Sequence, residues 1–220
     1  MIKKYKNFTL FDICDDDIKK WNFDNADFAR VYLPSNREFE IKMQNDGFYF
    51  ADRVIDVSIA VKKTEISQKI RFEIKEINKE YKSEILALAL KAFRGDRRFY
   101  ISPFLDDEIA GVILDDFIDK SGEILACFYK EEIIGFIALE EIADDVLFVR
   151  LACVDEKYRI SGASMSLYTK ALSVAKERGY SKLNGTISTL NWAVANVYSS
   201  FGAIFSNPQD IFLKDLRTNA

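Results

Sequence analysis

One segment of the sequence has the residue types of an anion-binding loop. Within Val149–Leu167 an apolar stretch runs into Arg159, Gly162 and Ser164, and a helical pattern begins at once. Small residues let the backbone approach a ligand closely, and the free N–H groups of a new helix attract an anion. Arg159 adds a fixed positive charge, so the segment predicts a pyrophosphate site. An ordinary strand–turn–helix connection is the competing interpretation.

A second segment places an amide and a phenol on one helical face. Asn191 and Tyr198 are seven residues apart, which is two helical turns, and Gly202 follows. Taken alone, the pair is more typical of an N-capping asparagine and a packed tyrosine than of a catalytic site. The sequence contains no histidine, so Ser-His-Asp and Cys-His catalysis are excluded. Acid–base chemistry therefore falls to carboxylates, tyrosine, lysine or water.

A series of strands and helices must position these two segments. The expected elements are helices over 73–93 and 107–119, strands over 124–129, 133–139 and 146–154, a helix over 163–176, a strand over 183–188, a helix over 191–200 and a strand over 211–214. The charged residues at 130–132 form the expected tight turn of a hairpin. Strands that alternate with helices late in the chain predict a mixed α/β sheet with helices on both faces.

A polar stretch near Lys62–Gln68 divides the chain into expected units at 1–67 and 68–220. The first unit weakly repeats the end of the chain. Asn36 opens a helix after a strand-like stretch, and a glycine closes the unit at the same 11-residue distance as in the second segment. Met43 then takes the place of Tyr198, so this copy would lack a proton donor. Chance similarity is the alternative, because strand–helix–Gly units are common.

Composition excludes several function classes. The net charge is −4 and no Lys/Arg-rich run stands out, so nucleic acid is not an expected partner. No apolar run approaches the roughly 20 residues needed to span a bilayer, and membrane insertion is not expected. The cysteines Cys14, Cys127 and Cys153 are far apart and odd in number, which favours neither a disulfide framework nor a metal site. A cytoplasmic location is expected.

Together the two segments resemble the GNAT superfamily of N-acetyltransferases. The shared pattern is Arg-x-x-Gly-x-small after a strand, then a helix, a strand and Asn-x6-Tyr-x3-Gly, within Phe72–Lys214. Ser164 and Ala203 depart from the usual Gly/Ala and Phe. The resemblance implies a mostly antiparallel central sheet with helices on both faces, a GNAT domain over 68–220 and a smaller half-GNAT-like domain over 1–67.

The resemblance also implies acetyl-CoA as cosubstrate and direct attack of an amine on the thioester. The cofactor-binding residues would be Ala152, Cys153, Val154, Arg159, Ser161, Gly162, Ala163, Ser164 and Asn191. The first three would pair their backbone with the pantetheine arm, and the loop would hold the pyrophosphate. Tyr198 would protonate the leaving thiolate, although a tyrosine pKa of about 10 against about 8.5 for a thiol makes the donation partial.

A narrower resemblance, to the TDP-fucosamine acetyltransferases, rests on Ala92-Phe93, on the run from Arg98 to Pro103 and on the helix expected over 107–119. That family acetylates the amine of a nucleotide-linked dideoxy sugar and carries an N-terminal half-domain shaped like part of a GNAT unit. Arg97, Arg98 and Tyr100 are then candidates for binding the nucleotide phosphates. A solvated basic turn is the alternative for these residues.

Other assignments stay open at the level of sequence. Glu140 and Glu141 are candidates for the general base, with a solvated strand end as the competing interpretation. The acceptor is alternatively a protein N-terminus, an amino acid or a polyamine. A GNAT-shaped domain that binds acyl-CoA without turnover is the second alternative. A homodimer is compatible with the sequence, which does not fix the oligomeric state.

Overall fold

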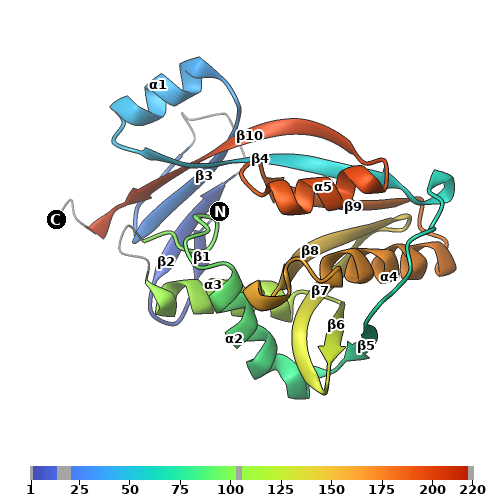
Figure 1. The fold of residues 1–220 in the computed structure, drawn as a ribbon. Helices are drawn as coiled ribbons and strands as arrows, with labels where there is room; N and C mark the ends of the chain where they lie inside the picture. The colour runs from blue at the N-terminus through green and yellow to red at the C-terminus, as the bar shows by residue number, and fades with distance from the viewer. Residues whose placement is uncertain (1, 14–20, 103–105, 218–220) are drawn as a thin grey trace.

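A single ten-stranded sheet runs through the computed structural model, which describes residues 2–13, 21–102 and 106–217 (Figure 1). The strand order is β1-β2-β3-β10-β4-β9-β8-β7-β6-β5. The strands are β1 Ile2–Lys4, β2 Thr9–Ile13, β3 Phe28–Pro34, β4 Tyr49–Ala60, β5 Glu73–Ile77, β6 Glu123–Tyr129, β7 Glu132–Ala143, β8 Val146–Val154, β9 Lys182–Ser188 and β10 Ile204–Asp215. Only β2–β3 and β8–β9 are parallel among the described pairs. The expected mixed, mostly antiparallel sheet is confirmed.

Helices cover both faces of this sheet, as expected. They are α1 Arg37–Asn45, α2 Lys82–Ala92, α3 Asp107–Asp119, α4 Ala163–Glu177 and α5 Trp192–Ser200. One buried cluster joins α4 and α5 to the sheet through residues such as Leu167, Leu172 and Tyr198. A second cluster packs α2 and α3 on the other face, around Phe136 and Leu151. No helix in the described ranges is long and apolar enough to cross a membrane.

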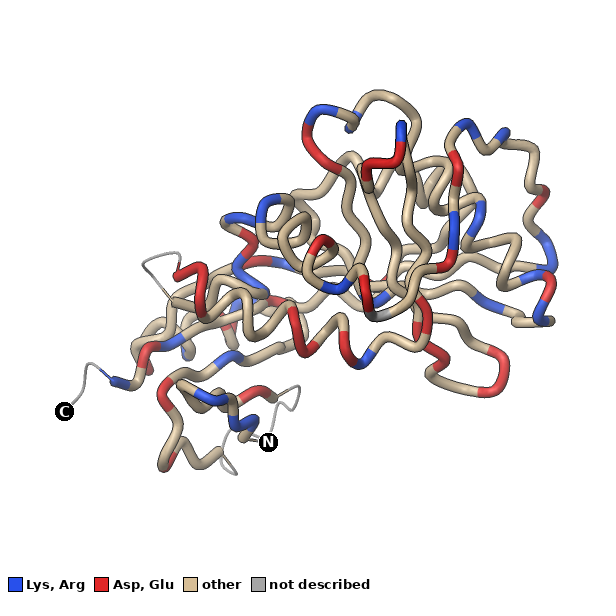
Figure 2. The backbone as a smooth tube through the Cα atoms, turned by 90° about the horizontal axis from the view of Figure 1, so that it is seen from below, with Lys and Arg blue, Asp and Glu red and all other residues tan. Residues whose placement is uncertain are grey.

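Charge is spread evenly over the fold. Figure 2 shows acidic and basic residues interspersed along the backbone of the described chain.

Strand β4 lies between two strands from the far end of the chain. It pairs antiparallel with β9, where Val54 faces Ser188, and with β10, where Arg53 faces Asp210. Figure 1 shows β4 and β10 running side by side along the top of the sheet. The two expected units therefore share one sheet, and their division near residue 67 stays a prediction.

The repeat read from the sequence has a spatial counterpart. The units β3-α1-β4 and β9-α5-β10 have the same layout, and each inserts its last strand between the two strands of the other. The resulting order, β3-β10-β4-β9, is therefore the same read backwards when the two units are interchanged. Asn36 and Asn191 both cap their helices through side-chain oxygens. The closing glycine of each unit has a positive φ, +79° at Gly47 and +70° at Gly202.

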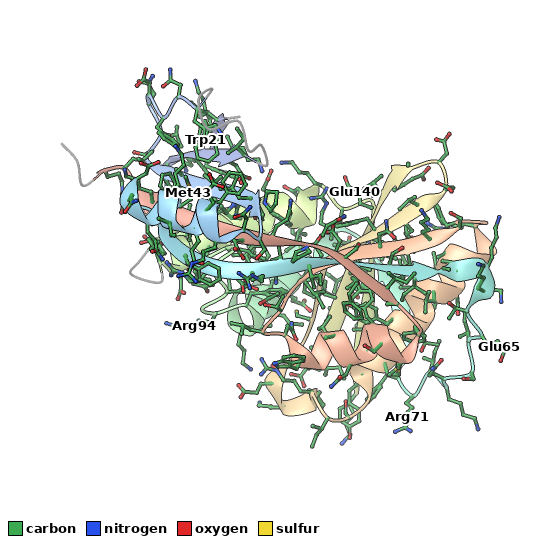
Figure 3. The ribbon with its side chains drawn as sticks, turned by 90° about the horizontal axis from the view of Figure 1, so that it is seen from above. Trp21, Met43, Glu65, Arg71, Arg94 and Glu140 are labelled. Carbon is green, nitrogen blue, oxygen red and sulfur yellow. The ribbon has the colours of Figure 1, made fainter. Side chains whose placement is uncertain are left out.

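The N-terminal unit is packed with apolar side chains at the place where the C-terminal unit borders a small cavity. Met43, fully buried at the position that corresponds to Tyr198, packs in a cluster with Phe11 and Phe48. Trp21 and Phe23 pack against the same cluster. Figure 3 shows Trp21 close to Met43. Apolar side chains thus occupy this half of the sheet.

One predicted element was wrong. The helix expected over 73–93 begins only at Lys82, and Glu73–Ile77 is strand β5. The spacing of Ile74 and Ile77 fits a helix, but the open edge of β6 offers five backbone pairs to this segment. Pairing across the sheet overrides the local periodicity. The hairpin turn is confirmed, with positive φ at Lys130 and Glu131.

Candidate active site

Strands β8 and β9 separate toward one end and leave a split in the sheet. They are paired only from Val146 with Lys182 to Val149 with Gly185. Opposite β7, a register shift leaves Arg150 as the extra residue of a bulge in β8. A bulge bends its strand and ends pairing. The side of β8 that faces β9 is therefore open beyond Val149.

A cleft of about 410 Å³ opens at this split. Seven of the residues predicted for the site line it together: Arg97, Ala152, Cys153, Val154, Arg159, Ser164 and Asn191. The sequence therefore identified residues from a turn, a strand, a loop and a helix start that meet around one cavity. Ser161, Gly162 and Ala163 adjoin it through the loop that leads into α4.

The loop before α4 has the geometry of an anion cradle. Gly162 has a φ of +90° and precedes the first helical residue, Ala163. The Ser161 hydroxyl accepts from Ala163 N at 3.3 Å and donates to the Tyr158 carbonyl at 2.7 Å, which holds the turn in place. The positive end of a 15-residue helix faces this loop.

Arg71 was missed by sequence reasoning and lies beside the same loop. A Cβ added to Gly162 would lie 3.7 Å from Arg71 Nη1, and Figure 3 shows this side chain projecting outward. Arg71 belongs to the irregular stretch before β5, so no motif marks it. With Arg159, it gives the loop two guanidinium groups.

Asn191 has the structural role that was its alternative interpretation. Its side-chain oxygen accepts from Val194 N at 3.2 Å and caps α5. The residue also lines the cleft. The cap fixes the side chain at the cavity wall, where its amide can contact a ligand.

Tyr198 lies in a smaller cavity of about 40 Å³ in the same split. It is 1% exposed, and its ring meets that of Tyr168 edge-on with centroids 4.9 Å apart. Burial, then the neighbouring Tyr168, raises the Tyr198 pKa well above its ordinary value, so the hydroxyl keeps its proton. Tyr168, which sequence reasoning missed, lines both cavities and connects them.

The three predicted substrate-binding residues are not all in the cleft. Arg97 lines it, while its guanidinium donates to Tyr49 Oη at 2.5 Å and to the Ser102 carbonyl at 3.0 Å. Arg98 lines the small cavity and is paired with Asp96 at 2.6 Å. Tyr100 lines neither cavity. It is 1% exposed and donates to the Leu90 carbonyl at 3.2 Å.

The glutamates considered for the base have other partners. Glu140 accepts from Arg150 Nε at 2.5 Å, and Glu141 accepts from the Tyr180 hydroxyl at 2.7 Å. Neither lines the cleft, and Figure 3 shows Glu140 well apart from Arg71 and Arg94. The carboxylates that do line it are Asp52 and Asp96. Sequence reasoning gave neither of them a role.

The cysteines are not activated. Burial raises the Cys153 pKa far above its ordinary value, and burial raises the Cys127 pKa to about 12. Both are free thiols, and neutral thiols are poor nucleophiles. Cys14 lies outside the described residues, and no metal-binding cluster occurs among those that are described.

The sequence of residues 73–203 matches the family model described as the acetyltransferase (GNAT) family. The chain belongs to this family. It is therefore an acetyltransferase that uses acetyl-CoA as the acetyl donor. The split between β8 and β9 and the loop before α4 both lie within the matched span. Strand β4, which borders β9, lies outside it. No curated protein matches the sequence.

Solved structures similar to this GNAT protein agree on the fold. A functionally unknown protein from Staphylococcus epidermidis has a TM-score of 0.60 at 14% identity, with 84% of this chain and 72% of the other covered. A putative GNAT acetyltransferase from Novosphingobium aromaticivorans has a TM-score of 0.56 at 14% identity, covering 85% and 73%. A glucosamine N-acetyltransferase region of a fungal multi-domain enzyme has a TM-score of 0.59 at 14% identity, covering 86% and 26%.

Proposed function

We propose that this enzyme acetylates the amine of a nucleotide-linked amino sugar by direct attack of the amine on the thioester. One observation carries the proposal. A single cleft is lined both by Arg159 and Ser164 of the anion loop and by the turn from Arg94 to Arg97. Donor and acceptor can therefore meet in one cavity.

The residues present fit acetyl-CoA. The loop of Arg159 to Ser164, with Arg71 beside it, offers helix N–H groups and cations to a diphosphate. The open side of β8 at Ala152–Val154 offers backbone groups to an extended arm, and Asn191 offers its amide. When bound, acetyl-CoA supplies an activated acetyl thioester.

Tyr198 is proposed as the proton donor to the leaving sulfur. Its raised pKa keeps the hydroxyl protonated at neutral pH, as an acid must be. Gly185 leaves room for that hydroxyl, since a Cβ there would collide with it. Because a tyrosine is a weaker acid than a thiol, the donation is partial in the transition state.

Arg94 supports an acceptor that carries phosphate. Its side chain is 67% exposed, it lines the cleft, and the pair it forms with Asp107 is long, at 3.9 Å. A guanidinium in this situation can bind a phosphate with two donors. The fungal fold neighbour is named for glucosamine acetylation, so an amino sugar is the acceptor of one protein with this architecture.

A small cationic amine without phosphate is the second candidate. Asp52 and Asp96 line the cleft and attract an ammonium group, while the guanidinium groups of Arg97 and Arg98 are already bonded within the protein. These contacts suit a polyamine or an amino acid as acceptor.

A screen of acceptors separates these candidates. CoA release from acetyl-CoA would be measured with TDP- and UDP-linked amino sugars, polyamines, amino acids and peptides. Preference for a nucleotide-linked sugar supports the proposal, and preference for a polyamine supports the second candidate. Acetyl-CoA binding without CoA release for any amine would identify a binding domain and contradict both.

The variant Gly162→Glu tests the anion loop. Glutamate strains the left-handed position and adds negative charge beside Arg71, at the positive end of α4. Calorimetry should detect no acetyl-CoA binding while circular dichroism stays native. Unchanged affinity in the folded variant would remove the diphosphate assignment.

A further inference from the structure

A carboxylate from the N-terminal part of the chain lies in the wall of the cleft. Asp52 is on β4, is 6% exposed and lines the cavity beside Ala51. The register between β4 and β10 shifts at this point: Asp52 faces Ile211 and Phe50 faces Phe212, so Ala51 is the extra residue. A bulge re-aims the neighbouring side chains.

Neighbouring groups hold the Asp52 carboxylate in one orientation. The Ser188 hydroxyl donates to Oδ1 at 2.9 Å, and Arg53 N donates to the same oxygen at 2.8 Å. Oδ1 is the oxygen that takes both bonds, which leaves Oδ2 as the atom available to accept a proton from a ligand. Ser188 itself lines the cleft at the end of β9.

The charges around Asp52 come from the turn after α2. Asp96 raises the Asp52 pKa and its salt-bridge partner Arg98 lowers it. Arg94 and Arg97 line the same cavity. Burial is the largest influence and raises the Asp52 pKa, assisted by Asp96, while the Ser188 hydrogen bond lowers it. The carboxylate is therefore a stronger base than an exposed aspartate.

We infer that Asp52 is the general base that takes a proton from the acceptor ammonium, so that β4 supplies one half of the acid–base pair. This inference rests on the proposed N-acetyltransferase function, for either class of acceptor. An ammonium nitrogen loses two protons when it becomes an amide. One passes to Asp52 Oδ2 and from there to water. The other, released as the amide forms, balances the proton that the leaving sulfur takes from Tyr198 when it leaves as a thiol.

The test compares nucleophiles that differ in their need for a base. Ethylamine is an ammonium ion at pH 7, because alkyl amines have pKa values near 10, whereas hydroxylamine is neutral. With Asp52→Asn, CoA release with ethylamine should fall about 10²- to 10³-fold, and release with hydroxylamine should fall less than about threefold. Ethylamine activity of the variant should then rise with pH toward the amine pKa.

The chain offers a matched control. Asp56 lies on the same strand and also accepts from a hydroxyl of β9, with Thr186 Oγ1 at 2.9 Å, but it does not line the cleft. Asp56→Asn should leave CoA release unchanged with both ethylamine and hydroxylamine. Infrared titration of the carboxyl band, wild type minus Asp52→Asn, should give an Asp52 pKa that coincides with the acidic limb of the ethylamine profile.

If Asp52→Asn does not fold, Ser188→Ala provides a second test. Loss of the donated bond should raise the Asp52 pKa and move both the infrared transition and the acidic limb to higher pH. Equal losses with both nucleophiles, or an acidic limb that stays in place, would overturn the assignment of Asp52 and leave the proposed function intact. If the wild-type protein does not release CoA with any of the amines tested, the proposed function is overturned, and the inference with it.

Discussion

Two tyrosines define the chemistry of the split at the scale of single residues. Tyr168 lines both cavities, whereas Tyr198 lines only the smaller one. Burial raises the pKa of Tyr168 to about 12, burial also raises that of Tyr198 well above its ordinary value, and the two rings meet edge-on. Both hydroxyls therefore remain protonated across the physiological range.

Replacement of Tyr198 by phenylalanine tests the proposed acid. The ring and its packing remain, so kcat should fall about 10²- to 10⁴-fold while acetyl-CoA affinity is unchanged. Loss of the buried hydroxyl beside Tyr168 should lower the free energy of unfolding by at most about 1 kcal/mol. Steady-state kinetics, calorimetry and urea denaturation measure the three quantities.

Tyr180→Phe is the matched control for this variant. Its hydroxyl donates to Glu141 at 2.7 Å and lines neither cavity. Stability should change, but kcat should not. If kcat of Tyr198→Phe stayed within about twofold of wild type with chemistry rate-limiting, Tyr198 would be a packed core residue only.

A second residue-scale prediction concerns pH and stability. Arg30 is 1% exposed and pairs with Asp12 at 2.8 Å. Burial alone would raise the Asp12 pKa, but the attraction of Arg30 and Lys3 outweighs it and holds that pKa well below its usual range. The stabilisation is complete above the unfolded pKa of about 4 and is lost as pH falls toward the folded value.

Asp12→Asn should therefore lower the free energy of unfolding by about 3–5 kcal/mol at pH 7, since it leaves the Arg30 charge buried without its partner. The variant should also lose part of the acid sensitivity that the low Asp12 pKa predicts for wild type below pH 4. Urea titrations from pH 7 to 3 measure both. The exposed carboxylate Asp24, replaced by asparagine, should leave both unchanged.

At the scale of elements, Gly185 shows how β9 makes room for helix α5. A Cβ at this position would collide with the Tyr198 hydroxyl, and a methyl of Val57 lies 3.5 Å away. Gly185→Ala should push the phenol out of place and lower kcat toward the level of Tyr198→Phe, with acetyl-CoA binding retained. Kinetics and calorimetry on the two variants make the comparison.

Gly111→Ala is the corresponding control. Gly111 lies within α3, and an added Cβ would meet only Leu90 atoms at 3.9 Å, an ordinary contact. Alanine should raise the free energy of unfolding by about 0.5–1 kcal/mol without affecting turnover. Equal turnover for Gly185→Ala and wild type would show that the position of the Tyr198 hydroxyl does not matter.

The elements that carry local motifs were predictable from sequence. Helix α4 and its loop follow from Gly162, and helix α5 follows from the asparagine cap at 191. Local signals of this kind depend on a few neighbouring residues. Strand β5 was mistaken for a helix because its pairing with β6 lies across the sheet.

The acceptor side of the cleft could not be predicted, because it depends on distant pairing. Asp52 and Ser188 are joined by a hydrogen bond between residues 136 positions apart. Tyr100 was expected to meet substrate, but it packs inward against α2. Nothing in the local sequence shows that Asp52 lines the cleft and that Tyr100 is packed away from it.

At the scale of the whole molecule, the exchanged strand makes the two halves interdependent. Residues 68–220 contain the family-matched segment, yet without β4 their strands β9 and β10 lose the partner that lies between them. The fragment 68–220 should fail to fold, because two long edges and their apolar faces are left open. Size-exclusion chromatography and circular dichroism of the fragment test this.

Removal of Ile2–Lys4 alone is the milder comparison. It takes away only edge strand β1, which pairs with β2, so most of the sheet should survive. A folded fragment 68–220 that releases CoA at the wild-type rate would contradict the interdependence. It would also exclude a contribution of Asp52 to turnover.

The placement of β10 also fixes when the molecule can be completed during its synthesis. Strands β3 and β4 are joined by α1, but they do not pair with each other. The space between them is filled by Ile204–Asp215, near the C-terminal end of the chain. On the ribosome, both strands must therefore keep one edge unpaired until β10, far behind them in the sequence, has been translated. Such late, long-range closure slows folding and exposes aggregation-prone edges, so chaperone contact with the nascent chain should concentrate on these two strands.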